Sequence, residues 1–505
     1  MDTSLSISTI YRQRKSTVNK NAQKMRKKIK SHIASKIEHF IVLHWDGKII
    51  QYLSGATEDR LAIAISAPNS IPGQFLASPV IEKGTGLAMS NCVYDVATEY
   101  GLLPQVQAMV FDTTASNTGQ FKGSVTLFEK RVGRALLWLA CRHHVPELFI
   151  KHASIAVRGP TDAPEDPLFK DFKRAFKSLN LNERTPWTWP VNPNDWRFIR
   201  ASEVLQWATI HMEVATWPRE DYLELIELVT VFLGGNVKRV HKGVAVAIEP
   251  SIRKPGAVHR ARFMASCLYL LKIYLYQEQY PTAAENLAHV RVLAEYVALL
   301  HAPYFLKSPL AISAPRQDRD FWVDVQCYQN CFRPGDVEHE MLSAVRKSIM
   351  NHLWYLTEEL VILALFDENV DDDERKNIAE SLLAVPRPAT FSAGKPAFPS
   401  PELMTANPSL HTFVGERSWL VFHKLGAVGQ WLHGGVTGWS DTDEYKMMHN
   451  VFKDLKVVND LAERCIKDIQ EYANIAKDSD RREDILLVVS DHRGVFQDLR
   501  KQALR

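Results

Sequence analysis

The chain has 505 residues, of which 46% are hydrophobic and 24% are charged, and its formal net charge at pH 7 is +3. This length predicts two or three domains, or one domain with a large insertion, and the composition is typical of a soluble globular protein. No apolar run of about 18 uncharged residues exists, and the N-terminus lacks the apolar core of a secretory signal, so we expect neither a membrane partner nor secretion.

Six cysteines are scattered along the sequence, at positions 92, 141, 267, 327, 331 and 465. This distribution predicts reduced thiols in an intracellular compartment rather than a disulfide framework. The nearest pair, Cys327 and Cys331, has no matching Cys or His pair at zinc-finger spacing, so the sequence does not imply zinc.

Residues 1–38 form a basic N-terminal arm. Ten Lys or Arg residues face one acid, Asp2, within positions 1–36. Such a segment predicts a disordered or helical arm that contacts nucleic acid, or a nuclear-localisation patch. A solvated basic helix without function is the alternative. The side chains assigned to nucleic-acid contact are Arg12, Arg14, Lys15, Lys24, Arg26, Lys27, Lys28 and Lys30.

Residues 39–157 alternate between strand and helix patterns. Three apolar runs joined by short links, at 39–46, 60–66 and 74–81, predict an antiparallel meander. The elements expected next are a helix at 84–103, a strand at 106–112, a helix at 122–133 and a strand at 135–141. This is the order of a ribonuclease-H-like α/β core with a mixed five-stranded sheet, in which the first and fourth strands are parallel neighbours.

Two of these strands are expected to end on an aspartate. The first ends on Asp46 and is closed by Gly47, and the fourth ends on Asp112, which precedes Thr-Thr-Ala-Ser-Asn-Thr-Gly. The carboxyl ends of strands are where α/β proteins usually place their chemistry. Neighbouring first and fourth strands would bring both acids to one sheet edge. The alternative is that each acid only begins a turn.

Residues 158–440 carry the pattern of a large all-α insertion. Apolar residues recur at helical spacing in 201–233, 258–300, 338–366 and 371–383, and Pro-rich linkers separate these segments. No repeat of 20–50 residues recurs, so a solenoid is not expected. Three tryptophans in one linker, Trp187, Trp189 and Trp196, could stack on bases, but packing within the loop or core is favoured.

Residues 441–478 are expected to complete the core as one long amphipathic helix at 443–476, ahead of a C-terminal tail at 479–505. On this helix Glu463 can overhang the sheet edge, whereas Asp460 is expected to face solvent. Asp46, Asp112 and Glu463 would then form a carboxylate trio. Carboxylates suit Mg²⁺, and phosphoryl transfer on nucleic acids uses such ions to activate the nucleophile and stabilise the leaving oxygen.

The fifth expected strand is followed by Cys141-Arg142-His143-His144. Neither a lowered thiol pKa nor a base within reach is established for Cys141, so structural residues at a strand end are the favoured interpretation. The order of the motifs and elements over residues 39–476, however, resembles that of the DDE transposases of the hAT (hobo/Activator) superfamily. The motifs that carry this resemblance are this Cys141-x-x-His144 segment, Trp-Asp46-Gly-Lys, Phe-Asp112-Thr-Thr and Asn-Asp-Leu-Ala-Glu463-Arg.

That resemblance implies a ribonuclease-H-like core interrupted by a helical insertion. It implies that Asp46, Asp112 and Glu463 are catalytic acids that bind Mg²⁺ or Mn²⁺, and that Cys141 and His144 occupy the family's Cys/Asp-x-x-His motif beside the active site. The implied activity is metal-dependent cleavage and strand transfer on DNA in the nucleus.

Residues 1–38 depart from this family, because they contain no Cys and a single His, His32, and so lack the ligands of a BED-type zinc finger. A catalytically silent domesticated or truncated derivative, acting as a nuclear DNA-binding or scaffold protein, is therefore the alternative. An unrelated metal-dependent nuclease is a third hypothesis, which leaves the insertion unexplained. The sequence leaves a homo-oligomer open.

Overall fold

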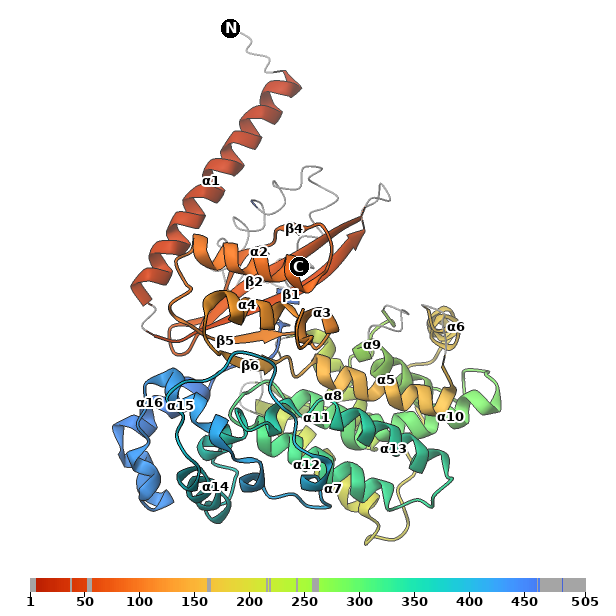
Figure 1. The fold of residues 1–505 in the computed structure, drawn as a ribbon. Helices are drawn as coiled ribbons and strands as arrows, with labels where there is room; N and C mark the ends of the chain where they lie inside the picture. The colour runs from red at the N-terminus through yellow and green to blue at the C-terminus, as the bar shows by residue number, and fades with distance from the viewer. Residues whose placement is uncertain are drawn as a thin grey trace.

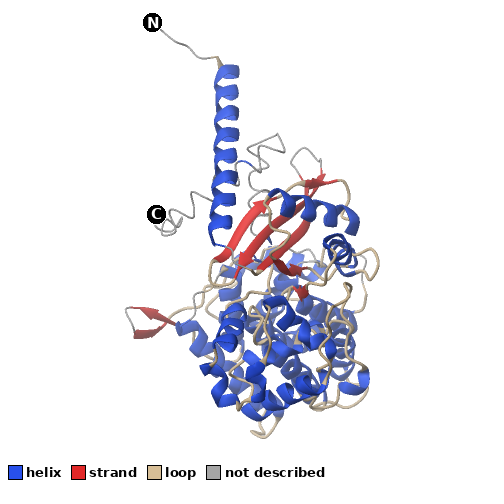
Figure 2. Cartoon of the chain, turned by 60° about the vertical axis from the view of Figure 1, so that its left-hand side comes forward, coloured by secondary structure: helices blue, strands red, loops and turns tan. Residues whose placement is uncertain are grey.

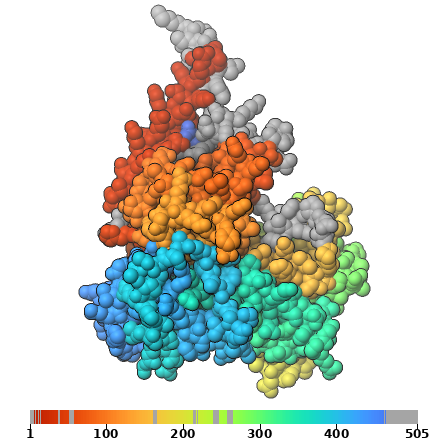
Figure 3. All heavy atoms as spheres, in the orientation of Figure 1, coloured from red at the N-terminus to blue at the C-terminus, as the bar shows by residue number. Residues whose placement is uncertain are grey.

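The computed structural model of the chain describes residues 6–36, 39–51, 57–160, 165–214, 217, 219–241, 244–256, 263–460, 462–463 and 484. A sheet with its helices lies above a larger helical body, and the first helix extends away from both (Figure 1). In space-filling form the two parts meet along one broad boundary (Figure 3). Within the described ranges, no helix has the length and apolarity that crossing a membrane requires.

The sheet is mixed, as predicted. Its order is β3-β2-β1-β5-β6, and the short β4 pairs with β2. The strands are β1 (Ile41–Gln51), β2 (Thr57–Ala67), β3 (Ile71–Ala77), β4 (Val80–Ile81), β5 (Val106–Phe111) and β6 (Leu137–Ala140). β2 runs antiparallel to β1 and β3, whereas β1, β5 and β6 are parallel. The first and fourth predicted strands, now β1 and β5, are therefore neighbours as expected.

One face of the sheet is covered by α2 (Gly86–Glu99) and α4 (Ser124–Val132), which pack on each other (Figures 1 and 2). The first turn of α2 lies against the loop that carries the short helix α3 (Ala115–Thr118). A Cβ atom on Gly86 would stand 2.0 Å from the carbonyl oxygen of Lys122 and 2.7 Å from that of Ser116. Glycine at this position is thus what lets the loop after β5 pack closely.

An aromatic row joins the sheet to the helical body. Strand alternation places Trp45, Phe111 and Trp138 on one face. Trp45 stacks on Phe111 with ring centroids 5.7 Å apart, and Phe111 meets Trp138 edge-on at 5.6 Å. Trp138 in turn stacks on Trp354 of the helical body at 6.2 Å. Large apolar area is buried at this boundary, which stabilises the docking of the two parts.

The helical body confirms the all-α character predicted for this region, with several of the predicted segments split. Its helices are α5 (His144–Arg158), α6 (Pro167–Ala175), α7 (Trp196–Val214), α8 (Glu220–Phe232), α9 (Phe263–Leu275), α10 (Ala284–Tyr296), α11 (Ala302–Lys307), α12 (Ala314–Gln329), α13 (Val337–Met350), α14 (Asp372–Ala384), α15 (Trp419–Leu425) and α16 (Asp443–Phe452). The expected segment 258–300 divides into α9 and α10 at Pro281, since proline interrupts the helical hydrogen-bond ladder. A hairpin of β7 (Lys238–His241) and β8 (Val244–Ala247) was not predicted.

The three clustered tryptophans pack inside this body, as favoured. Trp187 stacks on Phe232 and its Nε1 donates to Glu295 at 2.9 Å. Trp189 Nε1 donates to the Leu233 carbonyl at 3.0 Å. Trp196 stacks on Tyr328. These rings hold the linker against neighbouring helices.

The prediction of a single helix at 443–476 is wrong. α16 ends at Phe452, and residues 455–457 are extended because they pair with a loop of the helical body: Ala311 N donates to the Leu455 carbonyl, and Val457 N donates to the Pro309 carbonyl, both at 2.9 Å. A new helical turn begins at Asn459. The later residues of the expected apolar stripe, and the tail apart from Asp484, lie outside the described residues.

The basic arm is a helix, α1 (Ile7–Lys36), without an acidic residue along its length. It stands away from the sheet (Figure 2) and is attached near its C-terminal end. Ile33 is buried there, and Lys30 Nζ lies 3.1 Å from Glu99 Oε1 on α2. The expected arm therefore exists as a rigid element with an anchored base.

A buried arginine at the end of β6 ties the sheet to the helical body. The Arg142 side chain is 1% exposed and pairs with Asp318 of α12. Its guanidinium also donates to Gln317 Oε1 at 2.8 Å and to the Ser308 carbonyl at 3.3 Å. Its backbone N–H donates to the Val457 carbonyl at 2.9 Å. One residue thus contacts three separate segments.

Replacing Arg142 with Met should lower the free energy of unfolding by about 3 to 5 kcal/mol, because Asp318 is left as an uncompensated buried charge. Urea titration followed by tryptophan fluorescence measures the change. The matched control is Lys376→Met, which removes an exposed ion pair to Glu380 and should cost less than about 1 kcal/mol. Equal losses in the two variants would contradict a structural role for Arg142.

Candidate functional site

Asp46 and Asp112 lie at the same level of the sheet, although Asp46 is not at a strand end. The expectation that the first strand stops at Asp46 is wrong, since β1 continues to Gln51 and Asp46 pairs with Ala62 of β2. The parallel register aligns His44 with Val110. Asp46 lies two residues after His44, and Asp112 lies two residues after Val110. The two acids are therefore at the same level, directly after the end of β5.

Asp112 is held by the loop that follows it. Its Oδ1 accepts hydrogen bonds from the backbone N–H of Thr114 and from Asn117 Nδ2, both at 2.8 Å. The Asn117 amide oxygen accepts from Trp45 Nε1 at 2.9 Å and from the Ser124 hydroxyl at 2.5 Å. The Thr-Thr-Ala-Ser-Asn turn therefore orients the carboxylate through Asn117, in addition to beginning a turn.

Asp46 is a buried acid in an acidic environment. Its side chain belongs to the buried polar residues of the core. Burial raises the pKa of Asp46 to about 7, and the charges of Asp112 and Glu463 act in the same direction, against His144 and Lys48. A carboxylate kept beside other carboxylates at this cost in free energy is typical of functional sites.

Glu463 reaches the acids because the segment before it contacts β1 at Trp45 and the residue that follows β6. Asn459 Nδ2 donates to the Trp45 carbonyl at 2.9 Å, and its backbone N–H donates to Cys141 Sγ at 3.3 Å. The Glu463 backbone N–H donates to the Asn459 carbonyl at 3.0 Å, one helical turn later. Cys141 is thus a buried structural residue that positions the Glu463 turn.

His144 lies between the acids at the first turn of α5. Its Nε2 is 3.9 Å from Glu463 Oε1. Burial opposes protonation of this ring, but the neighbouring Cys141 thiol, Asp46 and Glu147 raise the pKa of His144 well above its ordinary value. The acids around His144 therefore favour its protonated form.

Glu147 is a further acid at this site. It follows His144 by three residues on α5 and so lies on the same helical face. Burial raises the pKa of Glu147 to about 7, and Glu463 and Asp46 contribute to the increase, whereas His144 and Arg219 oppose it. The spacing His-x-x-Glu at the start of a helix was the sequence pattern from which Glu147 could have been found.

The expectation that Asp460 faces solvent is wrong. Tyr222 donates a hydrogen bond to Asp460 Oδ1 at 2.7 Å, and His143 Nδ1 lies 3.3 Å from the same oxygen. Burial alone would raise the pKa of Asp460, but these hydrogen bonds and the nearby Arg219 lower it to about 2. Helical periodicity mispredicted the direction of Asp460 because the helix restarts at Asn459, next to the helical body.

Arg219, just ahead of α8, covers the outer side of Glu463. Its Nη1 lies 2.8 Å from Glu463 Oε2 and 3.9 Å from Asp460 Oδ1, and its Nη2 pairs with Asp221 at 2.6 Å. No local pattern predicts these contacts, since Arg219 is 244 residues away from Glu463 in the sequence. Glu463 is consequently shared between His144 and Arg219.

The site gathers the predicted acids without forming a ready metal cage. Across the ranges that the structure describes, no three His, Cys, Asp or Glu side chains lie close enough to hold one ion. The predicted DNA-contact residues of the arm lie on α1, and two of them pair elsewhere: Arg26 lies 3.0 Å from Asp484, and Lys30 pairs with Glu99. The arm thus has its own anchoring contacts and is not part of the acidic cluster.

The sequence matches no model of a known protein family and no curated protein.

The Asp46→Asn variant should be more stable than the parent at pH 8. Folded Asp46 has a raised pKa, so its contribution to stability is present below about pH 4 and is lost as the pH rises through about 7. Removing the charge should raise the free energy of unfolding by up to about 4 kcal/mol at pH 8, and this increase should disappear near pH 4.

Urea unfolding in EDTA at both pH values measures this difference. Asp95→Asn is the control, because Asp95 is an exposed acid of α2 with a side chain 70% accessible. A variant no more stable than the parent at pH 8 would show that Asp46 is not under electrostatic stress.

Proposed function

We propose that the protein binds DNA and catalyses metal-dependent phosphodiester cleavage and strand transfer, as a hAT-like transposase or a derivative of one. The observation that carries this proposal is that Asp46 of β1, Asp112 after β5 and Glu463 come from three segments, and that the charges of Asp112 and Glu463 both act on Asp46. The strand order and the helical body inserted between β6 and Glu463 support a ribonuclease-H-like core. The basic α1 supports a DNA partner and a nuclear location.

The donor set fits Mg²⁺ or Mn²⁺, because carboxylate oxygens are the hard ligands that these ions prefer. Asp46, Asp112 and Glu463 would hold the metal. When bound, the ions supply activation of a water or hydroxyl nucleophile and stabilisation of the leaving oxygen. The pKa values of Asp46 and Glu147 are raised by burial and by the neighbouring acids, and a cation held there would favour their ionised forms.

The remaining residues prepare the site. Asn117 fixes the orientation of the Asp112 carboxylate, and Asn459 fixes the start of the Glu463 turn. His144 carries positive charge beside the acids and is suited to stabilise a phosphate oxygen. Glu463 must exchange its contact with Arg219 for the metal, so Arg219 competes with metal at this carboxylate.

Asp112→Asn should reduce Mg²⁺- or Mn²⁺-dependent nicking of supercoiled plasmid by at least about 100-fold. DNA binding in EDTA should stay within about twofold of the parent, since removing one acid weakens no phosphate contact. Asp95→Asn, an exposed acid of the same part of the chain, should nick normally. If Asp112→Asn nicks like the parent, these acids do not carry the chemistry.

A second candidate function is DNA binding without cleavage, by a catalytically silent derivative acting as a nuclear DNA-binding or scaffold protein. The ion pair between Arg219 and Glu463 favours it, because that pair occupies the third acid. Arg219→Gln separates the two functions. If Arg219 only competes with metal, the variant should bind Mn²⁺ more tightly, by about tenfold for an exchanged ion pair, and should nick faster. A parent that binds DNA but does not nick, with an equally inactive Arg219→Gln variant, would identify the silent derivative.

A further inference from the structure

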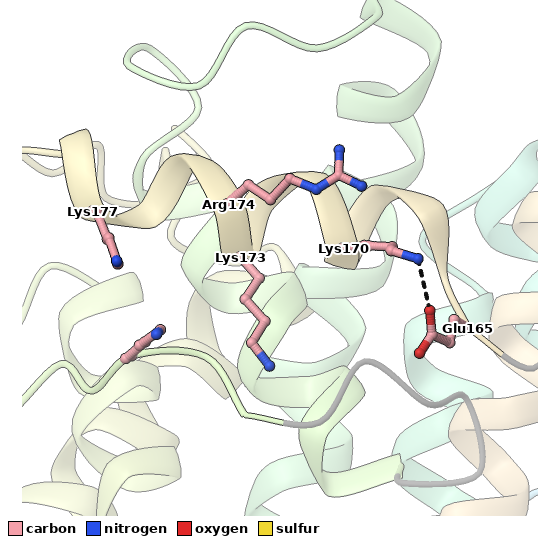
Figure 4. A pocket seen from close by; sticks show the side chains of 6 residues that line it. Glu165, Lys170, Lys173, Arg174 and Lys177 are labelled. Carbon is pink, nitrogen blue, oxygen red and sulfur yellow. Dashed lines mark hydrogen bonds and ion pairs between the residues drawn. The ribbon is translucent and has the colours of Figure 1, made fainter.

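A basic pocket lies on the helical body, apart from the acidic site. It has a volume of about 520 Å³ and is lined by five cationic side chains and one carboxylate: Lys170, Lys173, Arg174, Lys177, Lys254 and Glu165. α6 and the turn after it supply four of the cations, and the segment after β8 supplies Lys254. Figure 4 shows Lys173 and Lys177 extending from the same side of the helix.

The walls of this pocket are fixed by buried contacts. α6 buries Leu168, Phe169 and Phe172, and Phe169 stacks on Tyr269 with ring centroids 4.6 Å apart. Lys173 Nζ donates to the carbonyl of Gly256 at 2.5 Å, which joins α6 to the facing segment.

The facing segment is also anchored. Glu224 accepts a hydrogen bond from Arg253 N at 2.7 Å, and Lys272 Nζ donates to the Arg253 carbonyl at 2.8 Å. Lys254 therefore projects from a held backbone.

The positive charge of the pocket is only partly compensated. Lys170 pairs with Glu165 at 3.0 Å, a contact drawn in Figure 4, and Arg174 pairs with Asp171 at 3.0 Å. Neither Lys177 nor Lys254 forms an ion pair with any acid in the parts of the chain that the structure describes. Like charges gathered around one hollow attract an anion that has several oxygens.

The lining favours a phosphate backbone over a small metabolite. Pockets for small molecules are mostly apolar or aromatic, with a few polar groups that set orientation. Here every lining side chain is charged, and most are exposed. Such a surface recognises charge and carries no base information, as expected for contacts to phosphodiesters.

The position of the pocket relates it to the acidic site. α5 begins at His144, beside Asp46 and Glu463, and ends at Arg158, which forms an ion pair with Asp166 at the start of α6. A helix of 15 residues is about 22 Å long, which corresponds to roughly six or seven base pairs of duplex at 3.4 Å each. A duplex that extends from the acids along α5 would therefore approach α6, which carries the pocket.

We propose that the pocket lined by Lys173, Lys177 and Lys254 is a docking site for the phosphate backbone of duplex DNA. The inference that one duplex contacts both the pocket and the acidic site rests on the proposed function. The positive charge of the pocket is independent of that function. The pocket holds DNA without reading its sequence, and α5 is the helix that leads from the acids towards α6.

The test is binding of a fluorescein-labelled duplex to the full chain in EDTA, followed by anisotropy over a range of salt concentrations. The double variant Lys177→Glu/Lys254→Glu should bind at least about tenfold more weakly, and the slope of log affinity against log salt should fall by about two, one for each lost phosphate contact. The matched control is Lys347→Glu/Lys376→Glu, which changes net charge equally at exposed sites on α13 and α14 and should stay within about twofold.

The outcomes separate this proposal from the proposed function, because binding in EDTA needs no cleavage. If Asp112→Asn abolishes nicking but the pocket and control variants bind alike, the pocket proposal fails and the acid assignment stands. If the pocket variant alone loses binding while the parent never nicks, the pocket proposal stands. Tripolyphosphate and an RNA duplex serve as competitors. If one of them binds the parent but not the pocket variant, while both proteins bind DNA equally, the assignment of DNA as the ligand of the pocket is overturned.

Discussion

The buried guanidinium of Arg142 is the constraint on which the rest of the structure depends. Arg142 lies between Cys141 and His143, where the chain leaves the sheet after β6. The charge of its guanidinium is compensated by groups of the helical body. Its backbone also holds Val457, and through it the extended segment that leads to Glu463. A buried charge cannot be left without its partners, so the sheet, the helical body and the third acid are fixed in one arrangement. The acidic site is a consequence of that arrangement.

The free energy stored at the site has a clear origin. Asp46 and Glu147 are buried beside other carboxylates, and their pKa values rise to about 7. His144 and Arg219 provide the opposing positive charge. The pKa of Asp460, only three residues before Glu463, is instead lowered, because His143 and Tyr222 form hydrogen bonds with its carboxylate and Arg219 lies nearby. Neighbouring acids on one turn therefore have different roles: Asp460 stabilises the fold, and Glu463 is held between two cations that another cation could replace.

Local pattern was sufficient to find the strands, because continuous apolar runs ahead of Asp46 and Asp112 are typical of buried strands, although the turn residue after Asp46 placed the end of β1 too early. The order of the elements, rather than local pattern, predicted that the first and fourth strands are neighbours. Local pattern failed at Asp460 and along 443–476, where pairing of residues 455–457 with Pro309 and Ala311 overrides helical periodicity. Arg219 and Asn459 could not be found at all, since their contacts join segments hundreds of residues apart. Burial, which raises the pKa of Asp46, exists only once those segments have met.

The contacts of residues 457–459 with Trp45 of β1 and with Cys141 and Arg142 after β6 also determine the order of assembly in time. During synthesis the strands, Asp46, Asp112 and His144 emerge first, and more than 300 further residues must leave the ribosome before Asn459 can bond to the Trp45 carbonyl. Until then the acidic site lacks Glu463. A nascent or C-terminally shortened chain is thus kept from completing the site, however well its sheet has folded.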